Sequence, residues 1–143
     1  MELNKSERDH KMDQAIKKLW CDALRSGKYK QGHGGLKIVM EEGEDYSYCC
    51  LGVLCEVYRT TVSGSEQWMD GGPNQLEYLG RVDMLPSKVA MWADLQHCRL
   101  PDPEIDGSRG GMIAAMDALA EMNDDPEEKY KFEDLAGIIH NYL

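Results

Sequence analysis

Apolar side chains recur at steps of three and four residues in four stretches of the chain, which is the spacing of a helix with one buried face. The first stretch follows Ser6 and Asp9, which resemble a helix start with an acidic first turn, and it ends at Gly27. It predicts a helix of about twenty residues. Pro86 suits the first turn of a later helix. The four predicted helices occupy residues 9–26, 87–96, 112–123 and 132–142.

Two short runs in the first half of the chain have strand character. Residues 36–40 are aliphatic and β-branched, and residues 46–50 follow after a turn-like acidic segment, so together they predict a hairpin. Residues 50–58 are apolar apart from Glu56, and such a run fits either a strand or a helix. We favour a short buried helix, because its large side chains follow a 3.6-residue repeat.

The remaining segments complete an α+β fold. Residues 75–82 predict a short strand, and residues 100–111, with their prolines and glycines, predict an irregular connection. We find no internal repeat and no linker that would separate two domains. We therefore expect a mainly α single domain over residues 1–143, with about four helices and a small antiparallel sheet or hairpin.

The composition excludes several classes of protein. The 143 residues are 42% hydrophobic and 29% charged, which does not fit a disordered tail. No window approaches the roughly 20 apolar residues of a membrane-spanning helix, so we expect no membrane partner. A net charge of -10 argues against direct binding to duplex DNA, because phosphate contacts need clustered Lys and Arg. The first eleven residues lack the apolar stretch of a signal peptide, so the cytosol is the expected location.

Charge is nevertheless distributed unevenly along the chain. Residues 17–37 contain six basic side chains and one acidic, whereas residues 102–134 contain eleven acidic and three basic. If the two segments form separate faces, the basic face would attract an acidic partner and the acidic face a basic partner. The acidic half is either a solvated surface or a mimic of nucleic acid that docks on a basic host protein. The candidate protein-docking residues are Asp124, Asp125, Glu127, Glu128 and Trp68.

The most distinctive polar segment is the glycine- and lysine-rich stretch 28–37. Glycines let backbone N–H groups converge on an anion while lysines neutralise it, and Tyr29 and His33 can stack on a base. The alternative is a simple turn that leads into the hairpin. The candidate residues for a phosphate-bearing nucleotide are Arg25, Lys28, Tyr29, Lys30, Gln31, Gly32, His33 and Gly34.

The chain has five cysteines, an odd number without paired zinc-ligand spacing, so we expect free thiols, no metal and no cofactor. We interpret most of these cysteines as small, buried core residues. The other interpretation is a thiol nucleophile at Cys49 or Cys50, at the predicted strand-to-helix junction, where a helix N-terminus lowers a thiol pKa. The cysteines are Cys21, Cys49, Cys50, Cys55 and Cys98.

Five segments together resemble a family of small bacteriophage and prophage proteins that usually have no assigned function. The resemblance extends from about Trp20 to Ile139 and assigns no catalytic residue. It implies an accessory phage protein that acts in the host bacterial cytoplasm. The segments are Leu24–Gln31, Tyr48–Glu56, Leu85–Trp92, Leu119–Asp124 and Phe132–Ile139.

The expected function is therefore binding without catalysis. By analogy with other small acidic phage proteins, the chain would inhibit a host antiviral defence function. Its partner would be either a nucleotide signal, which it sequesters, or a host defence protein, on which its acidic face docks. A homodimer is a further hypothesis, although no sustained heptad supports one. The alternative function is a thiol-dependent enzyme that uses Cys49 or Cys50.

Overall fold

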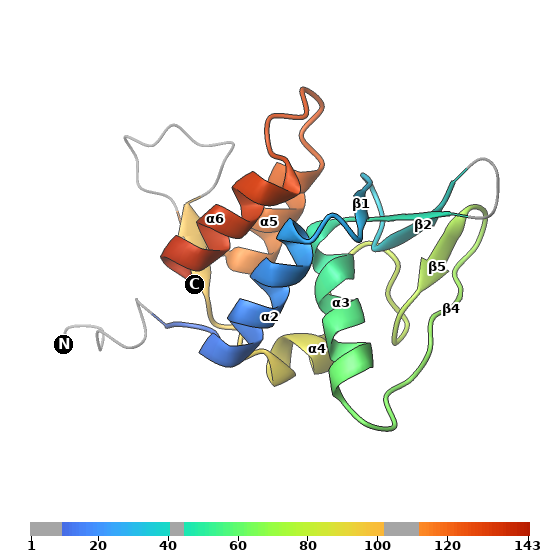
Figure 1. The fold of residues 1–143 in the computed structure, drawn as a ribbon, viewed down its shortest axis with the longest axis horizontal. Helices are drawn as coiled ribbons and strands as arrows, with labels where there is room; N and C mark the ends of the chain where they lie inside the picture. Colours follow the sequence, from blue (N-terminus) through green and yellow to red (C-terminus); the bar gives the residue numbers. More distant parts are fainter. Residues whose placement is uncertain (1–9, 41–44, 102–111) are drawn as a thin grey trace.

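The computed structural model describes residues 10–40, 45–101 and 112–143, and this part of the chain forms five helices and two sheets (Figure 1). The α+β prediction is confirmed. The helices are α2 (Gln14–Arg25), α3 (Cys50–Thr61), α4 (Ser87–Trp92), α5 (Ala115–Asn123) and α6 (Phe132–Tyr142). The strands are β1 (Lys30–Gln31), β2 (Lys37–Val39), β3 (Tyr46–Tyr48), β4 (Met69–Asp70), β5 (Gln75–Glu77), β6 (Arg99–Pro101) and β7 (Met112–Ala114).

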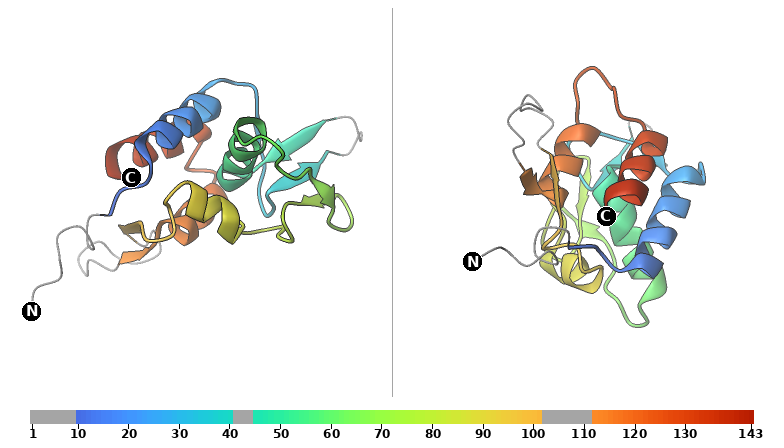
Figure 2. Two further views of the ribbon diagram at one scale, coloured as in Figure 1. Left: turned by 90° about the horizontal axis from the view of Figure 1, so that it is seen from below. Right: turned by 90° about the vertical axis from the view of Figure 1, so that its left-hand side faces the viewer.

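Helix α3 is the centre of the core. Every residue from Cys50 to Tyr58 is buried, so the continuous apolar run is a buried helix as predicted. A helix that is apolar on all sides must be surrounded by other elements that shield it from water. Helices α2, α4 and α5 and strand β3 pack against it, and α6 packs along α2 on the outer side (Figures 1 and 2).

The larger sheet lies beside this helical body, with the strand order β1-β3-β2-β5-β4 (Figure 1). Strands β2 and β3 form the predicted antiparallel hairpin, in which Lys37 pairs with Tyr48. Strand β1 pairs with β3 in parallel, although we expected residues 28–35 to be a loop. Gly32 follows β1 and lies so close to Ser47 of β3 that a Cβ would overlap the serine hydroxyl.

The first helix is shorter than its apolar stripe suggests. It begins at Gln14, and the Asp13 side chain caps it by accepting a hydrogen bond from the Ile16 N–H. The backbone N–H groups of Met12 and Asp13 donate instead to distant carbonyls, those of Leu143 and Ala93. Tertiary hydrogen bonds therefore hold this segment out of the helix. The expected start at residues 6–9 lies outside the described residues.

Two further boundaries differ from the prediction. Residues 112–114, expected to begin a helix, form β7 and pair with β6, which also takes residues 100–101 from the expected irregular connection. The rest of that connection, residues 102–111, lies outside the described residues. Helix α4 ends at Trp92, before the end of its predicted range. In the described residues, no helix combines the length and the apolar character that crossing a bilayer requires.

Candidate functional site

Part of the predicted phosphate-binding segment contacts the chain's own acidic half. The Gln31 side-chain amide donates to Asn123 Oδ1 at 3.1 Å, and Asn123 Nδ2 donates to the Gly32 carbonyl at 2.8 Å. Asn123 Oδ1 also accepts from the Cys50 N–H at 3.2 Å, and the residue is only 1% exposed. This buried link is not visible in the sequence, because an asparagine at a helix end is typical of a simple helix exit.

The glycine amide that we expected to face a phosphate faces a carboxylate. Gly34 N–H donates to Asp124 Oδ1 at 3.0 Å. His33 Nδ1 lies 2.7 Å from the Asn123 carbonyl oxygen, so it carries a hydrogen, and its Nε2 lies 3.6 Å from Glu128. The expectation that the basic and acidic segments lie apart is therefore wrong at this point, because the two segments are bonded together.

The expected docking surface is the connection between α5 and α6, which projects from the helices in Figure 1. Its charges have local partners. Asp125 accepts hydrogen bonds from the backbone N–H groups of Glu127 and Lys129, both at 3.2 Å. Lys129 also pairs with the Glu127 carboxylate at 3.2 Å, and Glu128 pairs with Lys131 at 3.5 Å. Several of these carboxylates are therefore already paired within the connection.

Two of the predicted ligand residues, Lys28 and Tyr29, line a hollow between α3, β3 and the end of α2. We call it the tyrosine hollow, and its volume is about 290 Å³. Lys30, on β1, is exposed and is not part of the lining. Arg25 lines a different depression, on α2. The tyrosine hollow is lined by Lys28, Tyr29, Asp45, Tyr46, Tyr48, Glu56, Arg59 and Thr60.

A buried lysine lies behind the tyrosine hollow, among aromatic rings. Lys37 is 9% exposed, and its ammonium lies 4.3 Å from the ring centre of Tyr46, 5.3 Å from that of Tyr48 and 5.2 Å from that of Trp68. It also lies 3.4 Å from a carboxylate oxygen of Glu56. Trp68, a candidate docking residue, is half-buried in this cluster.

Glu56 connects the buried charges. It is 4% exposed, accepts from Arg59 Nε at 2.7 Å and accepts from the Tyr48 hydroxyl at 3.3 Å. Burial lowers the pKa of Lys37 against the attraction of Glu56, and burial raises the pKa of Tyr48. The hydrogen bond from Arg59 to Glu56 raises the pKa of the guanidinium. With Lys28 and Asp45, the site combines three basic side chains with two carboxylates.

The thiols belong to the core. All five cysteines are buried and free. Cys49 caps α3, where its Sγ accepts from the Gly52 N–H at 3.4 Å, but burial outweighs this bond and raises its pKa to about 12. Burial also raises the pKa of Cys50 well above its ordinary value. A nucleophilic thiol needs the opposite shift and access to a substrate. Among the described residues, no group of three His, Cys, Asp or Glu side chains is arranged to hold a metal ion.

Comparison with known proteins gives one relationship. The family model described as "Domain of unknown function (DUF8296)" matches residues 12–143, which is most of the chain. No curated protein matches the sequence. No solved structure matches it either.

Proposed function

The chain belongs to the DUF8296 family, and we propose that it is a non-enzymatic binding protein that holds a phosphate-bearing nucleotide in the tyrosine hollow. The observation that supports this proposal most directly is the lining of that hollow. It combines exposed aromatic ring surface with two cationic side chains at its rim, and these are the groups that recognise a base and a phosphate.

The aromatic part of the site is held in position from behind. Tyr29 and Tyr48 meet edge to face with their ring centres 5.1 Å apart, and Tyr46 is 41% exposed. The Lys37 ammonium behind Tyr46 and Tyr48 holds both rings by cation–π attraction. A ring that is fixed before a base arrives loses less entropy when the base stacks on it.

The cationic part suits a phosphate. The Lys28 side chain is exposed, and Arg59 uses its Nε on Glu56 and one Nη on Gln67, so its guanidinium plane is fixed. Glu56 is already engaged by Arg59 and Lys37, and Asp45 is the remaining carboxylate. We assign Asp45 to the hydroxyl or amino donors of a nucleotide, because a carboxylate accepts hydrogen bonds from both.

The size of the hollow limits the ligand. Sites for small molecules usually enclose about 300–1,000 Å³. At about 290 Å³, the tyrosine hollow is close to the lower end of this range, so we propose a mononucleotide, or one end of a larger nucleotide, as its ligand. We propose binding without turnover, because the resemblance to the phage proteins assigns no catalytic residue.

The biological role follows from the resemblance to phage proteins. We propose that the protein acts in the cytoplasm of an infected bacterium and withdraws a nucleotide signal of host antiviral defence. Docking of acidic residues 124–128 on a host defence protein is the weaker mechanism, because these charges already serve internal hydrogen bonds and ion pairs.

Neighbouring lysines provide a matched test. We expect Lys28→Ala to weaken binding of AMP or GMP about fivefold. One exposed charge contact contributes about 1 kcal/mol to binding, which corresponds to this change in affinity. Lys30→Ala makes the same charge change outside the hollow and should leave the affinity unchanged. Isothermal titration calorimetry at low and high salt measures both variants, and thermal unfolding checks that their Tm values match. Equal losses in the two variants, or no binding by the unsubstituted protein, would overturn the proposal.

A further inference from the structure

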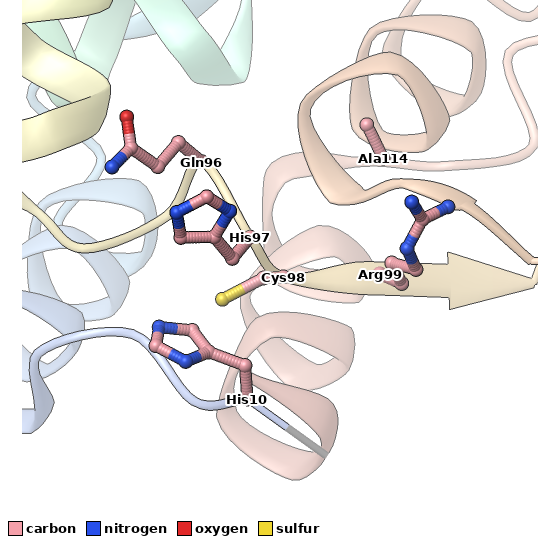
Figure 3. A pocket seen from close by; sticks show the side chains of 6 residues that line it. All are labelled: His10, Gln96, His97, Cys98, Arg99 and Ala114. Carbon is pink, nitrogen blue, oxygen red and sulfur yellow. The ribbon is translucent and has the colours of Figure 1, made fainter. Parts of the chain in front are cut away.

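A second pocket lies at the end of the molecule opposite the five-stranded sheet. We call it the histidine pocket, and its volume is about 420 Å³. It lies between the segment before α2, the connection from α4 to β6, and the β6–β7 pair (Figures 1 and 3). The pocket is lined by His10, Gln96, His97, Cys98, Arg99 and Ala114.

The connection into β6 brings an imidazole and a guanidinium to the pocket. His97, in the turn before β6, and Arg99, the first residue of β6, are exposed, whereas Cys98 and Leu100 between and beyond them are buried. Arg99 pairs in register with Ala114 of β7, and both residues line the pocket.

A second imidazole comes from the segment before α2. His10 Nε2 lies 3.1 Å from the Asp94 carboxylate, and its ring meets the His97 ring edge to face with centres 5.8 Å apart. Asp94 follows α4 in the left-handed conformation, at φ +56°. Within the described residues, His10 Nε2 is buried and has no hydrogen-bond partner, so it is available to a ligand. Figure 3 shows the Cys98 thiol beside the two imidazole rings.

The chemistry of this lining indicates the charge of its ligand. Each imidazole, the guanidinium and the Gln96 amide has an N–H group to donate, and the described residues that line the pocket include no carboxylate. Asp94 lies beside it, 3.1 Å from His10. A guanidinium repels cations and binds oxyanions through parallel N–H groups. From this juxtaposition of His10, His97 and Arg99 we infer that the histidine pocket binds a tetrahedral oxyanion of the phosphate class.

The pocket should respond to pH, because imidazoles gain positive charge between about pH 8 and pH 5. The other groups that face the two rings do not cancel this response. The guanidinium of Arg99 stays charged, Asp94 and Lys11 are the other charged side chains nearby, and burial raises the pKa of Cys98 to about 11, so its thiol stays neutral. Anion binding should therefore strengthen as the pH falls.

Sulfate and inorganic phosphate are suitable probes, and sulfate keeps both of its charges over this range. Two-dimensional NMR of the ring C–H groups of the full chain follows all four histidines. We expect saturable shifts at His10 and His97 with either anion. Sulfate should bind about fivefold more tightly near pH 6 than near pH 8. His33 and His140, which lie outside the pocket, are internal references.

Two arginine variants complete the test. Arg99→Ala should weaken anion binding about fivefold or more without loss of folding, because this side chain is exposed and its buried neighbours remain. Arg81→Ala removes an exposed arginine elsewhere and should have no effect. Unsaturated shifts at all four histidines would indicate an adventitious ion only, and unchanged affinity in Arg99→Ala would also overturn the inference. Lys28→Ala should leave these shifts unaltered, which separates this site from the tyrosine hollow.

Discussion

Gly52 lies where α3 passes closest to another part of the backbone. A Cβ at this position would overlap the carbonyl oxygen of Leu36 and lie 2.7 Å from its carbonyl carbon. A backbone carbonyl cannot rotate away as a long side chain can, so the helix or the start of β2 would have to move. We expect Gly52→Ala to lower the free energy of unfolding by about 3 kcal/mol, measured by urea denaturation.

Gly137 is the matched control for this substitution. It also lies within a helix, α6, but a Cβ there would meet no atom within 4 Å. Gly137→Ala should raise the free energy of unfolding by about 0.5 to 1 kcal/mol, because alanine loses less backbone entropy than glycine on forming a helix. Similar losses of stability in both variants would contradict the assigned role of Gly52.

At the scale of elements, Asn123 connects the end of α5 to the start of α3 and to the segment after β1. Its side chain bonds to Gln31, to the Gly32 carbonyl and to the Cys50 N–H, all in the interior. Asn123→Ala would leave several of these buried groups without a partner, at a cost of about 3 kcal/mol. Chemical denaturation monitored by circular dichroism measures the change.

An exposed asparagine on the last turn of α6 gives the comparison. Asn141→Ala should change the free energy of unfolding by less than about 0.5 kcal/mol, as surface substitutions usually do. If Asn123→Ala were equally mild, water would be replacing the asparagine, and the link between α5, α3 and β1 would carry little of the stability.

The interiors of the elements were easier to predict than their ends. Apolar periodicity correctly identified α2, α3, α5 and α6, and two runs of strand-forming residues around a turn-like segment identified the β2–β3 hairpin. The errors occur where distant chain segments compete for the backbone. Residues 112–114 pair with β6 although their apolar spacing fits a helix, and residues 12–13 bond to Leu143 and Ala93. Such hydrogen bonds are not visible in a local pattern.

Across the whole molecule, the buried thiols make the free energy of unfolding fall as the pH becomes alkaline. Burial raises the pKa of all five cysteines above 9.0, so the folded chain keeps protons that the unfolded chain loses. Stability is therefore fully present below about pH 8 and falls as the pH rises through 9. Between pH 7.5 and 9.5 we expect a loss of about 4 kcal/mol, measured by urea unfolding under reducing conditions.

Cys55→Ala tests the source of this loss. Cys55 is fully buried, and its removal should reduce the alkaline loss by about one fifth, because it is one of five such thiols, whatever it does to stability at neutral pH. The measurement stops at pH 9.5 so that tyrosine and lysine titration contributes little. An unchanged pH slope in this variant would mean that other groups cause the alkaline loss.

The sequence by itself determined which residues are apolar, at what spacing, and therefore the α+β fold class, the central helix and the free cysteines in the core. It also singled out Lys28 and Tyr29. Only the tertiary structure decided what surrounds them, because the other walls of the tyrosine hollow come from β3 and α3, and the buried partner Lys37 comes from β2. Apolar periodicity predicts local structure from neighbouring residues, whereas a site is formed by contacts between segments that are distant in sequence. For the same reason, the loop expected to bind phosphate is bonded to Asn123 and Asp124, about ninety residues away.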